Sequence, residues 1–406
     1  MQGAEENFQV EGNREVQAFL ERWLLLSREG KLNFVGLIAC KSATETYTDH
    51  VGVIGTEFAA NFAADNLKMQ IMGNVFRRLP PNVSPTAPAD RVVYNLASGP
   101  CSFDFLAWLQ TQEMRRMKEG APGPLKVAFS MGSDQVLQRC LVTDQRKIMF
   151  ENVMKPLIPM IGAVEITDLD NCRWPETYTL NTAVELFNNG APMPKLTVAD
   201  EAKAQVGKYL EGKPAPVVIT LRESDHWPHR NSDIPQWLKF ADYLIGKGEH
   251  VVFLRDSAKA NEPLEGYNTL PPCSIEINSR VALYKAAKVN IFCANGPATL
   301  CFFLDNPWFM IAPLDPSNAY PPGRAEWWLP HHGIPAYGQF PWNGPNQRII
   351  WELDRIDNMV AAWERYLAGE FNCPAPPNNV VALPHNPEIP AIWSGGVAPA
   401  AAGAGG

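Results

Sequence analysis

The segment of residues 216–256, PVVITLRESDHWPHRNSDIPQWLKFADYLIGKGEHVVFLRD, places one helical run between two apolar runs. Residues 216–221 and 250–254 are short and rich in Val, Ile, Leu and Phe, which is typical of buried strands. Residues 234–245 carry apolar side chains at helical spacing and end at Gly246. Because two parallel strands need a crossover connection, usually a helix, this order predicts a parallel sheet with helices on both faces.

The same order of strand, turn and helix recurs before and after this segment. Strands that alternate with helices favour an α/β fold over separate helical and β regions. Further strands are expected at residues 31–40, 91–97, 125–131, 162–167, 290–294 and 308–314, and further helices from Ser102, near 146–160, at 280–289 and at 298–304.

Length and composition divide the chain into four parts. A chain of 406 residues exceeds one ordinary hydrophobic core, so two domains are expected. Proline-rich stretches mark the breaks between parts, and the Pro, Ala and Gly composition of the C-terminus is typical of a disordered tail. The expected parts are an N-terminal extension at 1–90, an N-terminal Rossmann-like domain at 91–195, a C-terminal Rossmann-like domain at 196–368 and a Pro/Ala/Gly-rich tail at 369–406.

Composition also excludes several classes of protein. The net charge of -8 is spread without basic runs, which argues against nucleic acid as a partner. The acidic N-terminus does not resemble a secretory signal, and no apolar run approaches the roughly 20 residues of a membrane helix, so a cytoplasmic protein without a transmembrane segment is expected. The eight cysteines form no C-x-x-C pair, which indicates reduced thiols and no zinc site.

Charged residues follow the first strand of the opening segment at once. Arg222 comes directly after the apolar run and can offer a planar fork to a phosphate or carboxylate group. Asp225 can brace that guanidinium or bind a sugar hydroxyl. The alternative is an exposed loop whose ion pair stabilises the fold by about 0–1 kcal/mol.

A second cluster lies in residues 290–303, NIFCANGPATLCFF. Asn295, Gly296 and Pro297 form a turn, and proline suits the first helical position because it has no N–H to lose there. The N–H groups of residues 298–300 are then expected to be free and to face the sheet edge, where a diphosphate can bind. The alternative is a strand–turn–helix junction that binds nothing.

Together the two clusters resemble glycosyltransferases of the GT-B architecture, in particular the fucosyltransferase-like group that includes nodulation and protein O-fucosyltransferases. The His-x-Arg-x-x-Asp pattern of that group reads Thr220-Leu221-Arg222-Glu223-Ser224-Asp225 here, with threonine at the histidine position. Residues 99–114 and 339–351 also look like bacterial putative glycosyltransferases of polysaccharide gene neighbourhoods. The resemblance spans about residues 91–365.

The resemblance implies an α/β fold of the GT-B type, with two Rossmann-like domains facing a cleft and an N-terminal extension. It implies a metal-independent glycosyltransferase that moves a sugar from a nucleoside-diphosphate donor, with a GDP-sugar favoured, to a glycan or protein acceptor. The donor would bind the C-terminal domain as a co-substrate, no other cofactor is expected, and the chain could form a homo-oligomer. A non-catalytic scaffold that binds a glycan or a protein is the alternative, and a sugar-phosphate or nucleotide-sugar isomerase of the epimerase type is a third.

Site residues follow from the matched motifs and from the strand ends. The expected catalytic residues are Arg222, Asp225 and His226. The expected donor contacts are Arg222, Asp225, Arg255, Asp256, Asn295, Gly296, Pro297, Ala298 and Thr299. Candidates for the general base are Asp104, Asp225, His226, His229, Glu326, His331 and His332, and Gly132, Ser133 and Asp134 could line the opposite wall. Asp168 and Asp170 resemble a metal-binding Asp-x-Asp motif, but no second carboxylate cluster accompanies them.

Overall fold

A computed structural model of the chain describes residues 35–42, 45–51, 87–96, 99–130, 144–173, 180–225, 228–314, 325–371 and 380–382. The chain divides into two compact units, residues 1–78 and 79–406. Residues 132–134, His226 and the expected tail beyond residue 382 lie outside the described part. None of the helices described has the length and apolarity that crossing a bilayer requires.

The described residues of the first unit form a β-hairpin. Strand β1, Val35–Ser42, pairs antiparallel with β2, Glu45–Val51. The strand expected at residues 31–40 overlaps β1, whereas β2 was not predicted. The consecutive residues Thr46, Tyr47 and Thr48 suit a strand because β-branched and aromatic residues are enriched in strands.

The second unit contains a five-stranded sheet in which every strand pair is parallel, in the order β11-β10-β9-β7-β8. Its strands are β7 (Val217–Thr220), β8 (Val251–Leu254), β9 (Val289–Cys293), β10 (Trp308–Ile311) and β11 (Gln347–Ile350). Thr220 pairs with Leu254 on β8 and with Phe292 on β9. The loops after β7, β8 and β9 therefore begin side by side at one edge of the sheet.

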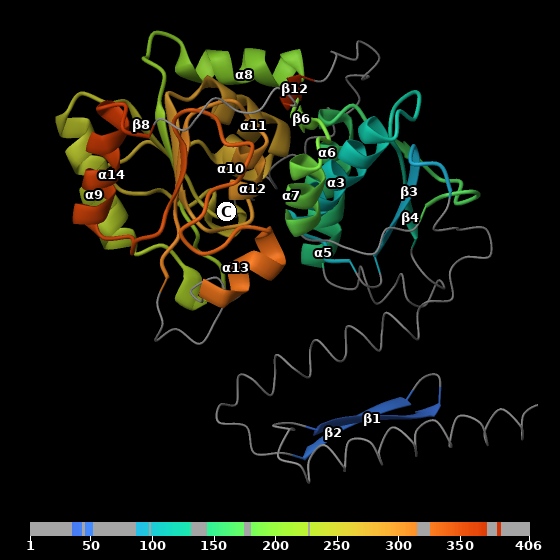
Figure 1. The fold of residues 1–406 in the computed structure, drawn as a ribbon. Coiled ribbons are helices and arrows are strands. Elements are labelled where there is room, and N and C mark those ends of the chain that lie inside the picture. The colour runs from blue at the N-terminus through green and yellow to red at the C-terminus, as the bar shows by residue number, and fades with distance from the viewer. Residues whose placement is uncertain are drawn as a thin grey trace, which may run out of the picture. The chain divides into compact units, whose positions relative to one another are not determined.

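Helices cover both faces of this sheet (Figure 1). Helices α9 (Ile234–Gly246) and α14 (Ile356–Leu367) lie on one face, and α10 (Pro271–Ile275), α11 (Ile277–Ala286) and α12 (Ala298–Phe302) lie on the other. The alternation along β7 explains the two layers. Val217 and Ile219 belong to the core on the α9 side, whereas Val218 belongs to the core on the α11 side.

A smaller parallel sheet precedes this one, in the order β3-β4-β5. Its strands are β3 (Arg91–Asn95), β4 (Lys126–Ser130) and β5 (Val164–Ile166), and its helices are α3 (Asp104–Lys118), α7 (Leu180–Asn188) and a continuous helix made of α5 (Asp144–Met149), the π-helical η1 (Phe150–Met154) and α6 (Lys155–Met160). Two parallel sheets with covering helices confirm the predicted α/β class. Helices α7 and α14 were not predicted.

A connecting segment joins the two sheets. It contains β6 (Met193–Lys195) and α8 (Asp200–Leu210), and β6 pairs in parallel with β12 (Val380–Ala382) near the end of the described chain. Helix α13, Ala325–His332, lies between β10 and β11 in the chain and contacts α7. The N–H of Leu196 donates to the carbonyl of Phe303 at 3.1 Å, which ties the segment to the end of α12.

One hydrophobic core runs through both halves of the second unit. Residues of α3, including Phe105 and Trp108, share a buried cluster with Leu300 and Phe302 of α12. The halves also lie close together at Gly296, where an added Cβ would lie 2.8 Å from the Phe103 ring. The turn after β9 therefore packs against the residue that precedes α3.

The Gly296 contact can be tested by adding one methyl group. We expect Gly296→Ala to destabilise the protein by about 1–3 kcal/mol because the methyl overpacks against Phe103. Gly207→Ala is the matched control. Gly207 lies inside α8 with nothing within 4 Å of an added Cβ, so alanine should stabilise the fold by up to about 1 kcal/mol. Denaturant unfolding measures both, and equal effects of the two substitutions would contradict the contact.

Candidate active site

Arg222 stands two residues beyond the end of β7, at the edge where three parallel strands finish. Its side chain is only 8% exposed. The Arg222 N–H donates to Ser232 Oγ at 2.9 Å, and the Ser232 N–H donates to the Arg222 carbonyl at 3.0 Å. These two bonds close the loop 222–232 on itself and fix where Arg222 leaves the sheet.

Asn231 orients the Arg222 guanidinium. Its Oδ1 accepts a hydrogen bond from Arg222 Nη1 and another from the Ser224 N–H at 3.0 Å, and its Nδ2 donates to the Ser224 carbonyl at 3.0 Å. Asp225, which was expected to brace this guanidinium, is exposed and makes no hydrogen bond or ion pair within the described part of the chain. That expectation is wrong, because the amide of Asn231 occupies the position. A donor contact by Asp225 stays a prediction.

Arg230 brings a second guanidinium to the same edge. It lies at the end of the 3-10 helix η2, Pro228–Arg230, and its Nη2 donates to the Ala294 carbonyl, just after β9, at 3.2 Å. Burial, and then the positive charge of Arg222, lower the pKa of Arg230 to about 10. Burial also lowers the pKa of Arg222, against the effect of Cys293 and Asp256.

Arg222 and Arg230 are two partly desolvated guanidinium groups of like charge, and the charge of Arg222 disfavours that of Arg230. A bound anion reverses this effect, and arginine forks match the geometry of phosphate oxygens. The arrangement is therefore suited to a ligand that carries more than one negative charge, such as a diphosphate.

Asp104 faces this pair from the other half of the unit. It begins α3, and its Oδ2 accepts a hydrogen bond from Ser102 Oγ at 2.8 Å. Desolvation by the surrounding protein raises the pKa of Asp104, and the Ser102 hydrogen bond and the charge of Arg230 oppose that rise. The side chain nevertheless reaches solvent. An accessible carboxylate with a raised pKa suits a general base.

The turn after β9 differs from its prediction. The N–H of Ala298 donates to Asn295 Oδ1 at 2.9 Å, and the N–H groups of Thr299 and Leu300 donate to the carbonyls of Gly296 and Pro297 at 3.1 Å each. The prediction that these N–H groups are free is wrong, because the turn's own residues accept from them. Any donor contact by residues 295–299 would need other atoms.

Arg255 also has a different role from the predicted one. Its Nε donates to Glu223 Oε2 at 2.9 Å and its Nη1 to the Glu262 carbonyl at 2.9 Å, and both partners of the Arg255–Glu223 ion pair are less than 10% exposed. Its fork thus ties the loop after β8 to the loop after β7. Asp256 precedes the 3-10 helix η3, Ser257–Lys259, and its charge acts on Arg222.

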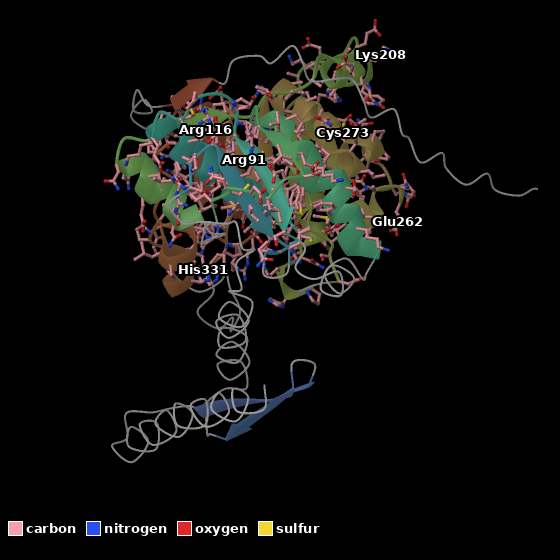
Figure 2. All side chains as sticks on the ribbon, turned by 90° about the vertical axis from the view of Figure 1, so that its right-hand side faces the viewer. Arg91, Arg116, Lys208, Glu262, Cys273 and His331 are labelled. Carbon is pink, nitrogen blue, oxygen red and sulfur yellow. The ribbon has the colours of Figure 1, made fainter. Side chains whose placement is uncertain are left out.

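The two histidines of α13 have different environments. The His331 ring (Figure 2) stacks on Trp327 with centroids 4.6 Å apart, and its Nδ1 lies 2.9 Å from the Trp327 carbonyl. The ring of His332 contacts both Trp327 and Trp328. Burial, and then the charges of His331 and Arg230, lower the pKa of His332 to about 3.

The other sequence candidates are exposed, pair elsewhere or lie outside the described residues. His226 and the side chain of Glu326 are outside that part of the chain, and His229 is exposed. Asp168 forms an ion pair with Arg91 at 3.0 Å, so its carboxylate stabilises the first sheet. Among the side chains described, no group of three or more His, Cys, Asp or Glu is placed to hold a metal ion.

The sequence analysis missed three residues of the site, namely Arg230, Asn231 and Ser232. The sequence signal for these residues was the run HRNSD at residues 229–233, which is polar throughout and lies between β7 and α9 in the chain. The path of the loop, which brings residue 231 back to residue 222, cannot be read from local sequence.

A scan against protein-family models finds no match to the chain, and a search of curated protein sequences finds none either. Among solved structures, it is similar to the E. coli ADP-heptose LPS heptosyltransferase II (11% identity, TM-score 0.38, covering 70% of this chain and 100% of that one). It is also similar to a family 9 glycosyl transferase from Veillonella parvula DSM 2008 (10%, 0.40, 70% and 99%) and to the E. coli heptosyltransferase WaaC with ADP (13%, 0.38, 70% and 100%).

The structural role of Arg255 is open to a direct test. Arg255→Ala should destabilise the fold by about 3–5 kcal/mol because it leaves the Glu223 carboxylate buried without its partner. Arg365→Ala is the control, since Arg365 pairs with Glu370 on the surface and should lose at most about 1 kcal/mol. Chemical denaturation measures both, and similar small losses would show that the Arg255–Glu223 pair does not hold the loops.

Proposed function

We propose that the chain is a GT-B-like glycosyltransferase that uses a nucleoside-diphosphate sugar as donor. The observation that carries this proposal is the pair Arg222 and Arg230 at the carboxyl edge of the five-stranded sheet, with the Asp104 carboxylate within electrostatic range. In open parallel sheets, ligands bind beyond the carboxyl ends of the strands. The sequence resemblance to GT-B enzymes supports the same function.

Each residue has a role in the proposed reaction. An oxygen of an acceptor hydroxyl forms a bond to the anomeric carbon of the sugar, while the bond from that carbon to the diphosphate oxygen breaks and its electron pair leaves with the diphosphate. Asp104 accepts the proton of the hydroxyl. Arg222 and Arg230 stabilise the negative charge that develops on the leaving group, which preorganised donors do by several kcal/mol. No metal ion or further cofactor is part of this proposal.

The proposal extends to the identity of the donor and of the acceptor. A GDP-sugar is the donor that the fucosyltransferase-like resemblance implies, and a glycan or protein hydroxyl is the implied acceptor. The similar solved structures are described with ADP or ADP-heptose, so binding of both ADP and GDP should be tested.

A non-catalytic scaffold is the second candidate, and one observation favours it. The residue at the family's histidine position, Thr220, is buried, and its Oγ1 lies 2.9 Å from Tyr284 Oη, so it contacts the core and not a ligand. Release of free sugar from a nucleotide sugar without acceptor separates the two candidates, because a binding scaffold releases none.

Nucleotide binding tests the arginine pair. We expect ADP or GDP to bind the wild-type chain, and we expect Arg222→Ala and Arg230→Ala each to weaken binding about 10- to 100-fold, the loss of one charge-assisted contact of about 1.5–3 kcal/mol. Isothermal titration with ADP, GDP, UDP and CDP measures this. Arg365→Ala is the control. It also removes one positive charge, but from α14, which is far in sequence from Arg222 and Arg230, so this variant should bind nucleotide like the wild type. Equal affinity in all four proteins, or no binding in any, would contradict the proposal.

Asp104 gives a prediction for activity and for its pH dependence. Asp104→Asn should lower transfer about 10²- to 10⁴-fold, because an amide cannot accept the proton of the acceptor hydroxyl. Wild-type activity should decline as pH falls through the raised pKa.

Asp357→Asn is the matched control for Asp104. Asp357 lies in the first turn of α14 and is exposed, so its loss should cost about 0.3–1 kcal/mol of helix-dipole stabilisation and leave transfer unchanged. Thermal melts and donor-hydrolysis assays on both variants decide the case. If Asp104→Asn keeps full activity, Asp104 is not the base.

A further inference from the structure

Tyr337 lies in the turn between α13 and β11, and two of its features are unfavourable for folding. Its side chain is 72% exposed, although the ring is large and mostly apolar. Its φ angle is 64°, a left-handed backbone conformation that costs bulky residues free energy. The other non-glycine residues with positive φ in the described part of the chain are Asn171 and Asn346, and asparagine tolerates this conformation. Folding alone would therefore favour glycine or asparagine at residue 337.

The turn that presents Tyr337 is fixed to the sheet. Trp351 Nε1 donates to the Gly338 carbonyl at 3.0 Å. Gln339 pairs with the main chain of Ile349 on β11, because its Nε2 donates to the Ile349 carbonyl at 2.9 Å and its Oε1 accepts from the Ile349 N–H at 2.7 Å. Backbone strain that the surroundings hold in this way is found preferentially at ligand-binding and active sites.

Trp351 lies beside Tyr337 and adds a second aromatic ring. The centroids of the two rings are 6.1 Å apart. Trp351 is half-buried, and its ring meets that of the buried Trp328 of α13 edge to face, with centroids 4.6 Å apart. The turn itself, PAYGQ at residues 335–339, contains no charged side chain. Tyr337 and Trp351, termed the aromatic platform below, therefore form a surface suited to an uncharged ligand.

Strand order places the aromatic platform at the same edge of the sheet as the proposed donor site. Trp351 directly follows β11, just as Ala294, whose carbonyl accepts from Arg230, directly follows β9. Only β10 separates β9 from β11, so the two strand ends are about 10 Å apart at the usual spacing of neighbouring strands. Figure 1 agrees, since α13, whose Trp328 contacts Trp351, lies at the end of the sheet opposite to α8, the helix that precedes β7.

We propose that the aromatic platform binds a sugar ring of the acceptor, so that the acceptor of the proposed transfer is a glycan and not a protein. This role rests on the proposed function. A pyranose carries C–H groups on its faces and hydroxyl groups around its rim, so one face packs on an aromatic ring while the rim stays hydrated. A short oligosaccharide is long enough to extend from the platform to the end of β9.

Tyr337→Asn tests this inference, because asparagine removes the ring and tolerates the backbone conformation. The wild-type chain is first screened on a microarray of oligosaccharides, and the oligosaccharide with the strongest signal is titrated. We expect its affinity to fall about 3- to 10-fold in Tyr337→Asn, the loss of one ring contact. The melting temperature of the ligand-free protein should not fall. Affinity for ADP and GDP, and donor hydrolysis without acceptor, should stay within twofold of wild type.

Two further variants complete the test. Tyr337→Phe keeps the aromatic ring and should retain most of the oligosaccharide affinity. Leu367→Asn is the control, because it removes an exposed apolar side chain from the C-terminal end of α14 and should change neither oligosaccharide nor nucleotide affinity.

The outcomes separate this inference from the proposed function. A wild-type chain that binds nucleotide but no oligosaccharide would overturn the inference alone, as would unchanged oligosaccharide affinity or a lowered melting temperature in Tyr337→Asn. Equal losses of oligosaccharide and nucleotide affinity in that variant would also overturn it, because the ring would then serve the donor. A chain that binds an oligosaccharide but no nucleotide would overturn the proposed function and the acceptor role with it, and binding of neither would overturn both.

Discussion

The interaction on which the site depends is the enforced proximity of two guanidinium groups, those of Arg222 and Arg230, at a partly desolvated sheet edge. Burial, and then the positive charge of Arg222, lower the pKa of Arg230 to about 10, so the surroundings disfavour its charged form. The fold maintains the pair with neutral acceptors, since Arg222 donates to Asn231 Oδ1 and Arg230 donates to the Ala294 carbonyl. The position of these partners follows from strand order, since β9 lies directly beside β7 and brings residue 294 to the loop 222–232.

The same edge collects other groups whose charged forms the fold disfavours. Asp104 has a raised pKa and His332 a lowered one, so the carboxylate and the imidazolium are both opposed by their surroundings. Apolar packing on both faces of the five-stranded sheet stabilises the fold around them. The fully buried indoles of Trp237 and Trp363 lie on one side, and Leu300 lies in the core shared with α3 on the other. Perturbed groups that gather at one place are characteristic of functional sites.

Local sequence predicted the fold where hydrophobic runs and helix stops agree. The strands at 217–220 and 251–254 were predicted because short Val- and Ile-rich runs flank a helix that ends at glycine. Arg222 was predicted because it follows a buried strand at once. Helix α14 was missed, although its amphipathic pattern supplies Met359 and Trp363 to the core.

The remainder of the site depends on contacts between segments distant in the chain. Glu223 neutralises Arg255 because β7 and β8 are neighbours, and this pairing removed Arg255 from the donor contacts. The amide groups at the start of α12 were expected to be free, but Asn295 folds back onto one of them. Both outcomes are set by side-chain geometry at a turn or between loops, which periodicity does not encode.

A crystal structure of the chain soaked with ADP or GDP tests the central claim most directly. The account requires the β-phosphate to lie within hydrogen-bonding distance of the guanidinium groups of both Arg222 and Arg230. A diphosphate bound elsewhere, with the two arginines still engaged by Asn231 and the Ala294 carbonyl and without contact to the ligand, would contradict it.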